Sequence, residues 1–288
     1  MSAENSISEL HKLNQKAGKI KLRLDADSNI VVLLVEGKTD KDLFKRVFER
    51  NDRVVCIAVD GKENLYALLA VPELQKERYV NRVIAVRDRD YTDPAQYPEK
   101  MFAYDCCAME LMLLRHPKMQ DMLRNFYPLQ ERFPLEMIRR IALFSLLRRD
   151  NEKSENKWGL NFEKPSVLAG SENNMPNMEK LFSIYEENYS ALQGRYEEYR
   201  DKADRLPEET LWDITNGHDI CVLLGNHCVI GGTRQKLDDI RYCALMIALY
   251  QPEYFQDTRL YQDSLYTYEL PNRTYPFRFE SAARDADA

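Results

Sequence analysis

Short runs of apolar, often β-branched residues recur in the first third of the chain, and each is followed by a helix-like pattern. The clearest run covers residues 30–35, and the stretch after it carries an apolar stripe at positions 43, 44, 47 and 48. A run that is apolar throughout is typical of a parallel strand covered on both faces. Similar runs at 53–59, 81–86 and 101–105 alternate with helix-like segments, which predicts right-handed crossovers and a parallel α/β sheet.

Local signals indicate where the first helices begin and end. Thr39 is a candidate N-cap, with Asp42 three residues later. Asp105 is placed to cap the helix 106–116, which Pro117 stops.

The strand signal fades from about residue 118, and helical patterns at 135–149 and 178–206 follow. We therefore expect an N-terminal extension at 1–28, a parallel α/β core at 29–117, a mainly α-helical accessory region at 118–280 that completes the fold, and a flexible tail at 281–288.

Composition sets limits on partners and compartment. The 288 residues carry a net charge of −6, so no global positive field attracts nucleic acid or anionic lipid, and any phosphate-binding surface has to be local. The best local candidate contains Arg139, Arg140, Arg148 and Arg149, although a solvated helix face explains the same pattern. No run approaches the roughly 20 apolar residues of a membrane span, and the N-terminus has no apolar signal region. Six cysteines without a C-x-x-C pair indicate buried, reduced thiols, so we expect a soluble cytoplasmic protein that binds no membrane.

Carboxylates follow two of the predicted strands. Glu36 comes after the first run, and Asp88 and Asp90 come after the third. In an open parallel sheet, ligands bind outside the carboxyl ends of the strands. Three carboxylates there repel one another unless they are protonated or bridged by cations, and Mg²⁺ favours oxygen ligands. The pattern therefore predicts a Mg²⁺ site with one or two ions, which Mn²⁺ could also fill.

The D-x-D pair is a weak signal alone, because acidic pairs are common in turns. In an extended segment Asp88 and Asp90 would face one side and Arg89 the other. Gly37 would allow the backbone to approach a phosphate closely. Glu110, on an apolar helix stripe, is a further candidate metal ligand, although it would also complement the helix dipole if that end is exposed.

Basic side chains beyond the strand ends are candidates for contact with phosphate. Lys38 could act at the reacting phosphate, and Lys62, Arg89 and His218 could bind substrate. Solvation of an ordinary loop is the alternative for both lysines. In the "NGHDI" stretch, Gly217 could instead end one helix while Asp219 caps the next.

A strand ending in Glu-Gly, two βα units and a strand ending in Asp-x-Asp together resemble the TOPRIM domain, a Rossmann-like fold shared by topoisomerases, primases and OLD-type nucleases. Glu36 matches the family glutamate, and Asp88 and Asp90 match its D-x-D pair. The resemblance implies that the aspartates hold Mg²⁺ and that the glutamate assists proton transfer or also binds metal. TOPRIM motifs cover roughly residues 30–115.

The stretches "VEGKTDKDLFKRVF", "VDGKENL", "VRDRDY", "YDCCAMELMLL" and "NGHDICVLL" resemble the TOPRIM effectors of bacterial anti-phage systems, in particular the PARIS system. This implies a metal-dependent endoribonuclease with tRNA as substrate. It also implies an ABC-type ATPase partner that restrains the nuclease, and dimerisation of the released subunit. Arg87 departs from the family pattern, because such strands usually run apolar up to the first aspartate.

Three alternatives remain open. The carboxylates would serve cleavage of DNA as well as RNA, as in OLD-like nucleases. Asp88, Asp90 and Thr92 also fit the D-x-D-x-T motif of haloacid-dehalogenase-like phosphatases, with Asp88 as nucleophile. Finally, the acids could bind a metal or nucleotide in a non-catalytic interaction module, with the C-terminal aromatic residues forming an interface.

Overall fold

The computed structural model describes residues 3–49, 52–127, 133–153, 158–162, 167–168 and 176–268. These residues divide into two compact units, the first drawn from 1–87, 94–103 and 251 onward, and the second from 88–93 and 104–250. The sequence-based division instead kept 88–93 and 104–117 with the sheet and 251–280 with the helices. The predicted tail at 281–288 lies outside the described residues.

The first unit contains a four-stranded, all-parallel sheet. Its strands are β1 (Val31–Val35), β2 (Val54–Ala58), β3 (Val83–Arg87) and β4 (Met101–Ala103), in the order β2-β1-β3-β4. Val35 lies opposite Ala58 on one side and Val86 on the other. The predicted parallel α/β sheet is therefore confirmed.

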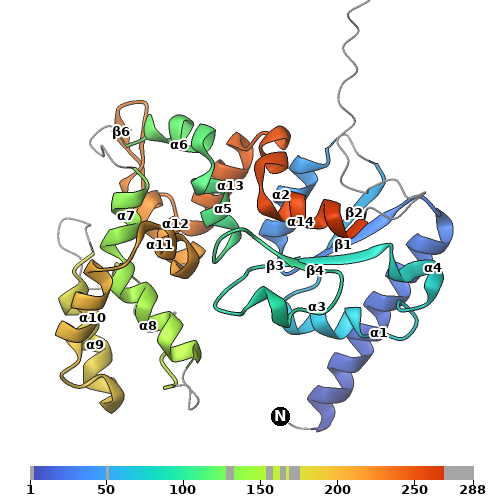
Figure 1. Ribbon diagram of the computed structural model, residues 1–288, viewed down its shortest axis with the longest axis horizontal. Coiled ribbons are helices and arrows are strands. Elements are labelled where there is room, and N and C mark those ends of the chain that lie inside the picture. The colour runs from blue at the N-terminus through green and yellow to red at the C-terminus, as the bar shows by residue number, and fades with distance from the viewer. Residues whose placement is uncertain are drawn as a thin grey trace, which may run out of the picture. The chain divides into compact units, whose positions relative to one another are not determined.

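Helices cover both faces of this sheet (Figure 1). Helices α1 (Ala3–Ala26) and α3 (Lys62–Leu69) lie on one face, and α2 (Lys38–Val47) and α14 (Arg259–Tyr268) on the other. Shorter segments complete the unit: α4 (Glu77–Val80), η1 (Pro94–Gln96) and η3 (Pro252–Asp257).

Side chains alternate across the strands, as the pleat requires. Val32 and Leu34 of β1 pack in one core cluster with Ile20 of α1 and Leu65 of α3. On α2, Phe44 packs edge-on against Phe255 of η3 at a centroid distance of 5.8 Å. Because both faces are covered, the strands carry apolar residues at nearly every position, which is the pattern in the sequence; Arg87, the last residue of β3, is the exception.

Two predicted helix caps are wrong. Helix α2 has Gly37 rather than Thr39 as its N-cap, and the Asp40 carboxylate accepts the Gly37 N–H at 2.9 Å. Ala108 rather than Asp105 precedes the helix after β4. In both cases a residue of the capping type lies nearby in sequence, but the chain turns at another position.

The second unit is mainly helical, as predicted for the C-terminal region. Its helical segments are α5 (Met109–Arg115), α6 (Pro117–Arg124), α7 (Leu135–Arg140), α8 (Ala142–Lys153), α9 (Met178–Asn188), η2 (Ser190–Leu192), α10 (Tyr196–Asp204), α11 (Glu208–Ile214), α12 (Gly217–His227) and α13 (Asp239–Leu249). A two-residue turn at Gly231 and Gly232, both with positive φ, joins the short antiparallel strands β5 (Val229–Ile230) and β6 (Thr233–Arg234).

The arginines predicted as a basic surface are engaged within the second unit. Arg148 pairs with the buried Asp219, and Arg139 donates to the carbonyl of Leu206. The other two contact carboxylates: Arg140 that of Glu136 and Arg149 that of Asp150. The solvated-face alternative fits Arg140, and internal pairing accounts for Arg148.

The cysteines agree with the sequence-based expectation. All six are free thiols; five are buried, and Cys56 is half-buried. Within the described residues, no helix combines the length and apolar character needed to cross a bilayer.

Candidate functional site

Glu36 is the first residue after β1, at the carboxyl edge of the sheet. Its backbone carbonyl accepts the N–H of Gly61 at 3.0 Å, which fixes the chain at the strand end. Its side chain is 22% exposed, whereas the carboxylate oxygen Oε1 is buried and lies 3.5 Å from Nε of Arg87. The Glu36 side chain is therefore partly accessible to solvent, and one of its oxygens is buried beside a cation.

Arg87 is the last residue of β3, paired in register with Ala103 of β4. Its side chain is only 3% exposed. Nη1 donates to the hydroxyl of Tyr66 at 3.0 Å, and the guanidinium carbon lies 5.3 Å from the ring centroid of Tyr97. Contact of a guanidinium with aromatic faces is favourable, so two tyrosines and one carboxylate enclose this charge.

Lys38 and Lys62 are the first residues of α2 and α3, the helices that follow β1 and β2. Lys38 is exposed and Lys62 is half-buried. Both therefore begin a helix just beyond the carboxyl edge of the sheet, where the sequence placed them.

Asp88 belongs to the second unit, in which its carboxylate accepts a hydrogen bond from the backbone at the start of a helix. Its Oδ1 accepts the backbone N–H of Met109, the first residue of α5, at 2.9 Å. Ala108, the N-cap residue of α5, has no side chain that accepts a hydrogen bond, so Asp88 supplies the acceptor from elsewhere in the chain. This carboxylate has a structural role independent of any metal.

Asp90 does not continue an extended segment. Strand β3 ends at Arg87, and Asp90 has a φ of 48°, in the left-handed region. Its N–H donates to the carbonyl of Cys107 at 2.8 Å, and its own carbonyl accepts from Cys107 Sγ at 3.4 Å. The expected extended segment through Asp90 is therefore wrong, because the chain turns within the motif, and simple alternation does not apply to the two aspartates.

Arg89 is engaged within the second unit. Nη1 donates to the carbonyl of Asp105 at 3.2 Å, and Nη2 lies 3.0 Å from the carboxylate of Asp213. These contacts attach the D-x-D turn to the residues before α5 and to α11. The side chain is about a quarter exposed, so a role in substrate binding would have to compete with this pair.

Glu110 lies on α5 against the start of α12. Its Oε1 is 3.8 Å from Cys243 Sγ of α13, and its carboxylate lies beside Gly217. A negative charge at a helix N-terminus is favourable, so packing between helices accounts for this half-buried acid. The predicted role of Glu110 as a metal ligand remains a prediction.

The "NGHDI" stretch forms the start of α12. Gly217 is the first residue of this helix and does not end α11, which stops at Ile214. The Asn216 side chain caps α12, so the reading of Asp219 as the cap is wrong. His218 Nδ1 lies 3.0 Å from Asp239, and its side chain is 60% exposed.

The candidate acids suit a hard cation by their chemistry, because each offers carboxylate oxygens. Glu36 belongs to the first unit, and Asp88, Asp90 and Glu110 to the second. Among the residues that the structure describes, no group of three or more His, Cys, Asp or Glu side chains is gathered closely enough to hold a metal ion.

Sequence reasoning missed the tyrosines that surround Arg87. Tyr66 lies on α3, and Tyr97 comes just after η1, so neither is close to Arg87 in sequence. The available signal was the lone arginine ending an apolar run. A cation at that position needs compensating partners, and Glu36 is one of them.

Comparison with models of known protein families gave no match for this chain, and comparison with curated proteins gave none either.

Proposed function

We propose that this protein is a Mg²⁺-dependent TOPRIM-type endonuclease that cleaves RNA. The observation that carries the proposal is the order of the sheet: β1 and β3 are neighbouring parallel strands with Val35 opposite Val86, and a carboxylate of the TOPRIM pattern follows each of them directly, Glu36 and Asp88. The residues that follow the two strands leave the sheet at the same edge, which is where parallel sheets bind ligands.

Asp88, Asp90 and Glu36 would hold the ion, and Glu110 is a further candidate. Mg²⁺ bound there would supply the positive charge that polarises a phosphodiester and lowers the pKa of a bound water. Glu36 accepts or relays a proton, which its partial exposure permits. Lys38 and Lys62, at the starts of α2 and α3, neutralise the phosphate and the charge that develops on it.

The substrate and partners in this proposal come from the resemblance. The motif set most resembles AriB, the nuclease subunit of the PARIS defence system. On this basis the substrate is tRNA, an ABC-type ATPase subunit holds the enzyme inactive, and the released protein acts as a homodimer to abort infection.

The structure specifies which variant tests the site cleanly. Asp88→Ala would remove both the negative charge and the acceptor for Met109 N–H, so lost activity could reflect a disturbed α5. Asp88→Asn keeps an acceptor oxygen and removes the charge. Asp60→Asn is the matched control: Asp60 also follows a strand, pairs with Lys16 and has positive φ, which asparagine tolerates.

The assay incubates purified protein and Mg²⁺ with labelled tRNA, single-stranded DNA and duplex DNA. Wild type and Asp60→Asn should cleave tRNA, while Asp88→Asn and Glu36→Gln should lose at least about 100-fold in rate, in line with removal of groups that stabilise developing charge. If the protein cleaves DNA and not tRNA, the alternative of a DNA-cleaving, OLD-like nuclease is correct. If wild-type protein hydrolyses a phosphate monoester and Glu36→Gln retains that activity, the phosphatase alternative is correct.

Restraint by a partner could silence the purified protein, so the same variants are also expressed in cells and their RNA is profiled. New tRNA fragments from wild type and Asp60→Asn, but not from Asp88→Asn, are expected. Identical RNA profiles from all three, with all three proteins folded, would favour a non-catalytic interaction module.

A further inference from the structure

We propose that Arg87 is a positioning residue that holds the Glu36 carboxylate and acts as its built-in counter-charge. This inference rests on the proposed function, because it assigns Glu36 its neighbour in that site. Arg87 is not part of the TOPRIM pattern, and it ends a strand whose other residues are apolar.

Burial of the guanidinium favours the pair with Glu36. The Arg87 side chain is 3% exposed, and an isolated buried charge is strongly unfavourable unless a carboxylate and hydrogen bonds compensate it. Glu36 supplies the carboxylate at 3.5 Å, and Tyr66 supplies a hydroxyl acceptor at 3.0 Å. Moving Glu36 away would leave the cation buried without this partner.

Both ends of the pair stand on rigid backbone. Arg87 is held between β1 and β4 as part of β3, and Glu36 follows the neighbouring strand with its carbonyl bonded to Gly61. The rings of Tyr66 and Tyr97 lie 5.8 and 5.3 Å from the guanidinium carbon. The position of Nε is thus set by the sheet and by two aromatic side chains, and the buried Oε1 of Glu36 lies 3.5 Å from it as an ion-pair partner.

This arrangement has opposite effects on metal affinity and turnover. Arg87 offsets part of the charge on Glu36, which weakens attraction of the carboxylate for a divalent cation. It also fixes the carboxylate in place, and catalytic groups act well only when their geometry is held. Removing the charge of Arg87 should therefore tighten Mg²⁺ binding and slow turnover.

Arg87→Gln is the test variant, and Arg82→Gln is its matched control. Arg82 immediately precedes β3, at the opposite end of the same strand, and donates to the backbone carbonyls of Ile30 and Leu24 at 2.9 and 3.0 Å. Both substitutions remove an arginine that is bonded inside the first unit. Only Arg87→Gln removes a cation beside Glu36.

Mg²⁺ binding is measured by titration calorimetry and turnover with labelled tRNA. Relative to wild type, Arg87→Gln should bind Mg²⁺ about three- to tenfold more tightly, because a like charge has left, and turn over at least about tenfold more slowly. Arg82→Gln should keep the wild-type Mg²⁺ affinity. If Arg87→Gln and Arg82→Gln give the same Mg²⁺ affinity, Arg87 has a structural role alone and the inference is wrong.

A thermal-denaturation cycle tests the pair without catalysis. Arg87→Gln and Glu36→Gln should each lower the melting temperature, and the double variant should lower it by less than their sum. Additive effects would overturn the pairing. The proposed function is instead refuted if the wild-type protein binds no Mg²⁺, or if Asp88→Asn does not change its Mg²⁺ affinity, even when the cycle shows coupling. The failure of the pairing and the failure of the proposed function are therefore distinguishable.

Discussion

Glu110 occupies the space that a side chain at Gly217 would need. A β-carbon on Gly217 would lie 2.8 Å from Cδ of Glu110 and 2.9 Å from Cβ of Ala108, both closer than real β-carbons approach other atoms. The start of α12 can therefore lie against α5 only with glycine at this position. Close backbone approach is a recurrent reason for glycine at a helix contact.

Gly217→Ala should destabilise the protein by about 1–3 kcal/mol, the usual cost of overpacking. Gly18→Ala is the control: Gly18 lies in α1, and an added β-carbon would meet nothing within 4 Å. Alanine there should stabilise the helix by roughly 0.5–1 kcal/mol. Urea denaturation measures both, and Glu110→Ala should recover part of the loss in the Gly217→Ala background. Equal effects of the two alanines would contradict the contact.

Asp219→Asn should be severely destabilising. Nε and Nη2 of Arg148 donate to the two Asp219 oxygens at 2.5 and 2.9 Å, and these side chains are 16% and 3% exposed. Removing one member of a buried pair leaves an uncompensated charge, at a cost of about 3–5 kcal/mol. Glu197→Gln, in an exposed pair with Arg200, should cost less than about 1 kcal/mol. Denaturant titration of both variants tests this contrast, and similar costs would contradict it.

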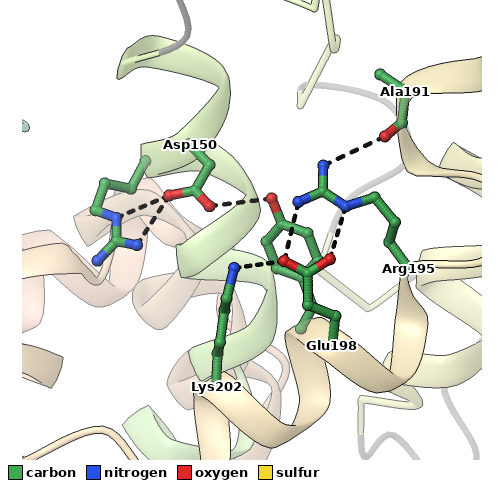
Figure 2. A network of polar contacts seen from close by, with 7 residues as sticks. Asp150, Ala191, Arg195, Glu198 and Lys202 are labelled. Carbon is green, nitrogen blue, oxygen red and sulfur yellow. Dashed lines mark hydrogen bonds and ion pairs between the residues drawn. The ribbon is translucent and has the colours of Figure 1, made fainter.

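The pH dependence of the helical unit should include a contribution from Glu198. Figure 2 shows its carboxylate between Arg195 and Lys202. Hydrogen bonds from Arg195 and then Lys202 lower the pKa of Glu198 to about 2, from its ordinary value of 4.5. Because the folded pKa is lowered, the stabilisation is fully present above pH 4.5 and is lost as the pH falls toward 2.

Melting temperatures of wild type and Glu198→Gln should therefore differ above pH 4.5 and converge as the pH approaches 2. The measurement is a series of thermal denaturation curves over the pH range in which both proteins fold. A difference that stays constant through acid pH would show that the variant acts through packing rather than through charge.

The native thiols should react slowly with an aromatic disulfide reagent at pH 8. Burial raises the pKa of Cys56 and of Cys106 to about 12, so almost none of either thiol is the reactive thiolate. All six cysteines should react rapidly after denaturation. Of the six, half-buried Cys56 should be the first to react in the native protein. A rapid native reaction at another cysteine would contradict its burial.

Patterns of near neighbours in sequence predicted much of the fold. Mostly apolar runs identified all four strands of the sheet, because strands covered on both faces carry few polar residues, and Arg87 at the end of β3 is the exception. The helical character of the second unit followed from periodicity. Caps were less predictable: Thr39 and Asp105 are good capping residues, but where the chain turns depends on tertiary contacts such as that of Asp88 with Met109.

For the candidate site, too, some features followed from the sequence and others only from the tertiary structure. The sequence alone determined that Glu36 and Asp88 each follow a strand of a parallel sheet, since strand type and chain order are local properties, and the structure added that β1 and β3 are neighbours. Only the tertiary structure decided what each side chain contacts: Arg87 for Glu36, Asp213 for Arg89, Gly217 for Glu110 and Asp239 for His218. These partners come from distant positions or other elements of the chain. They are selected by the cost of burying charge and by the shape of the packed helices. A short sequence motif encodes neither of these two factors.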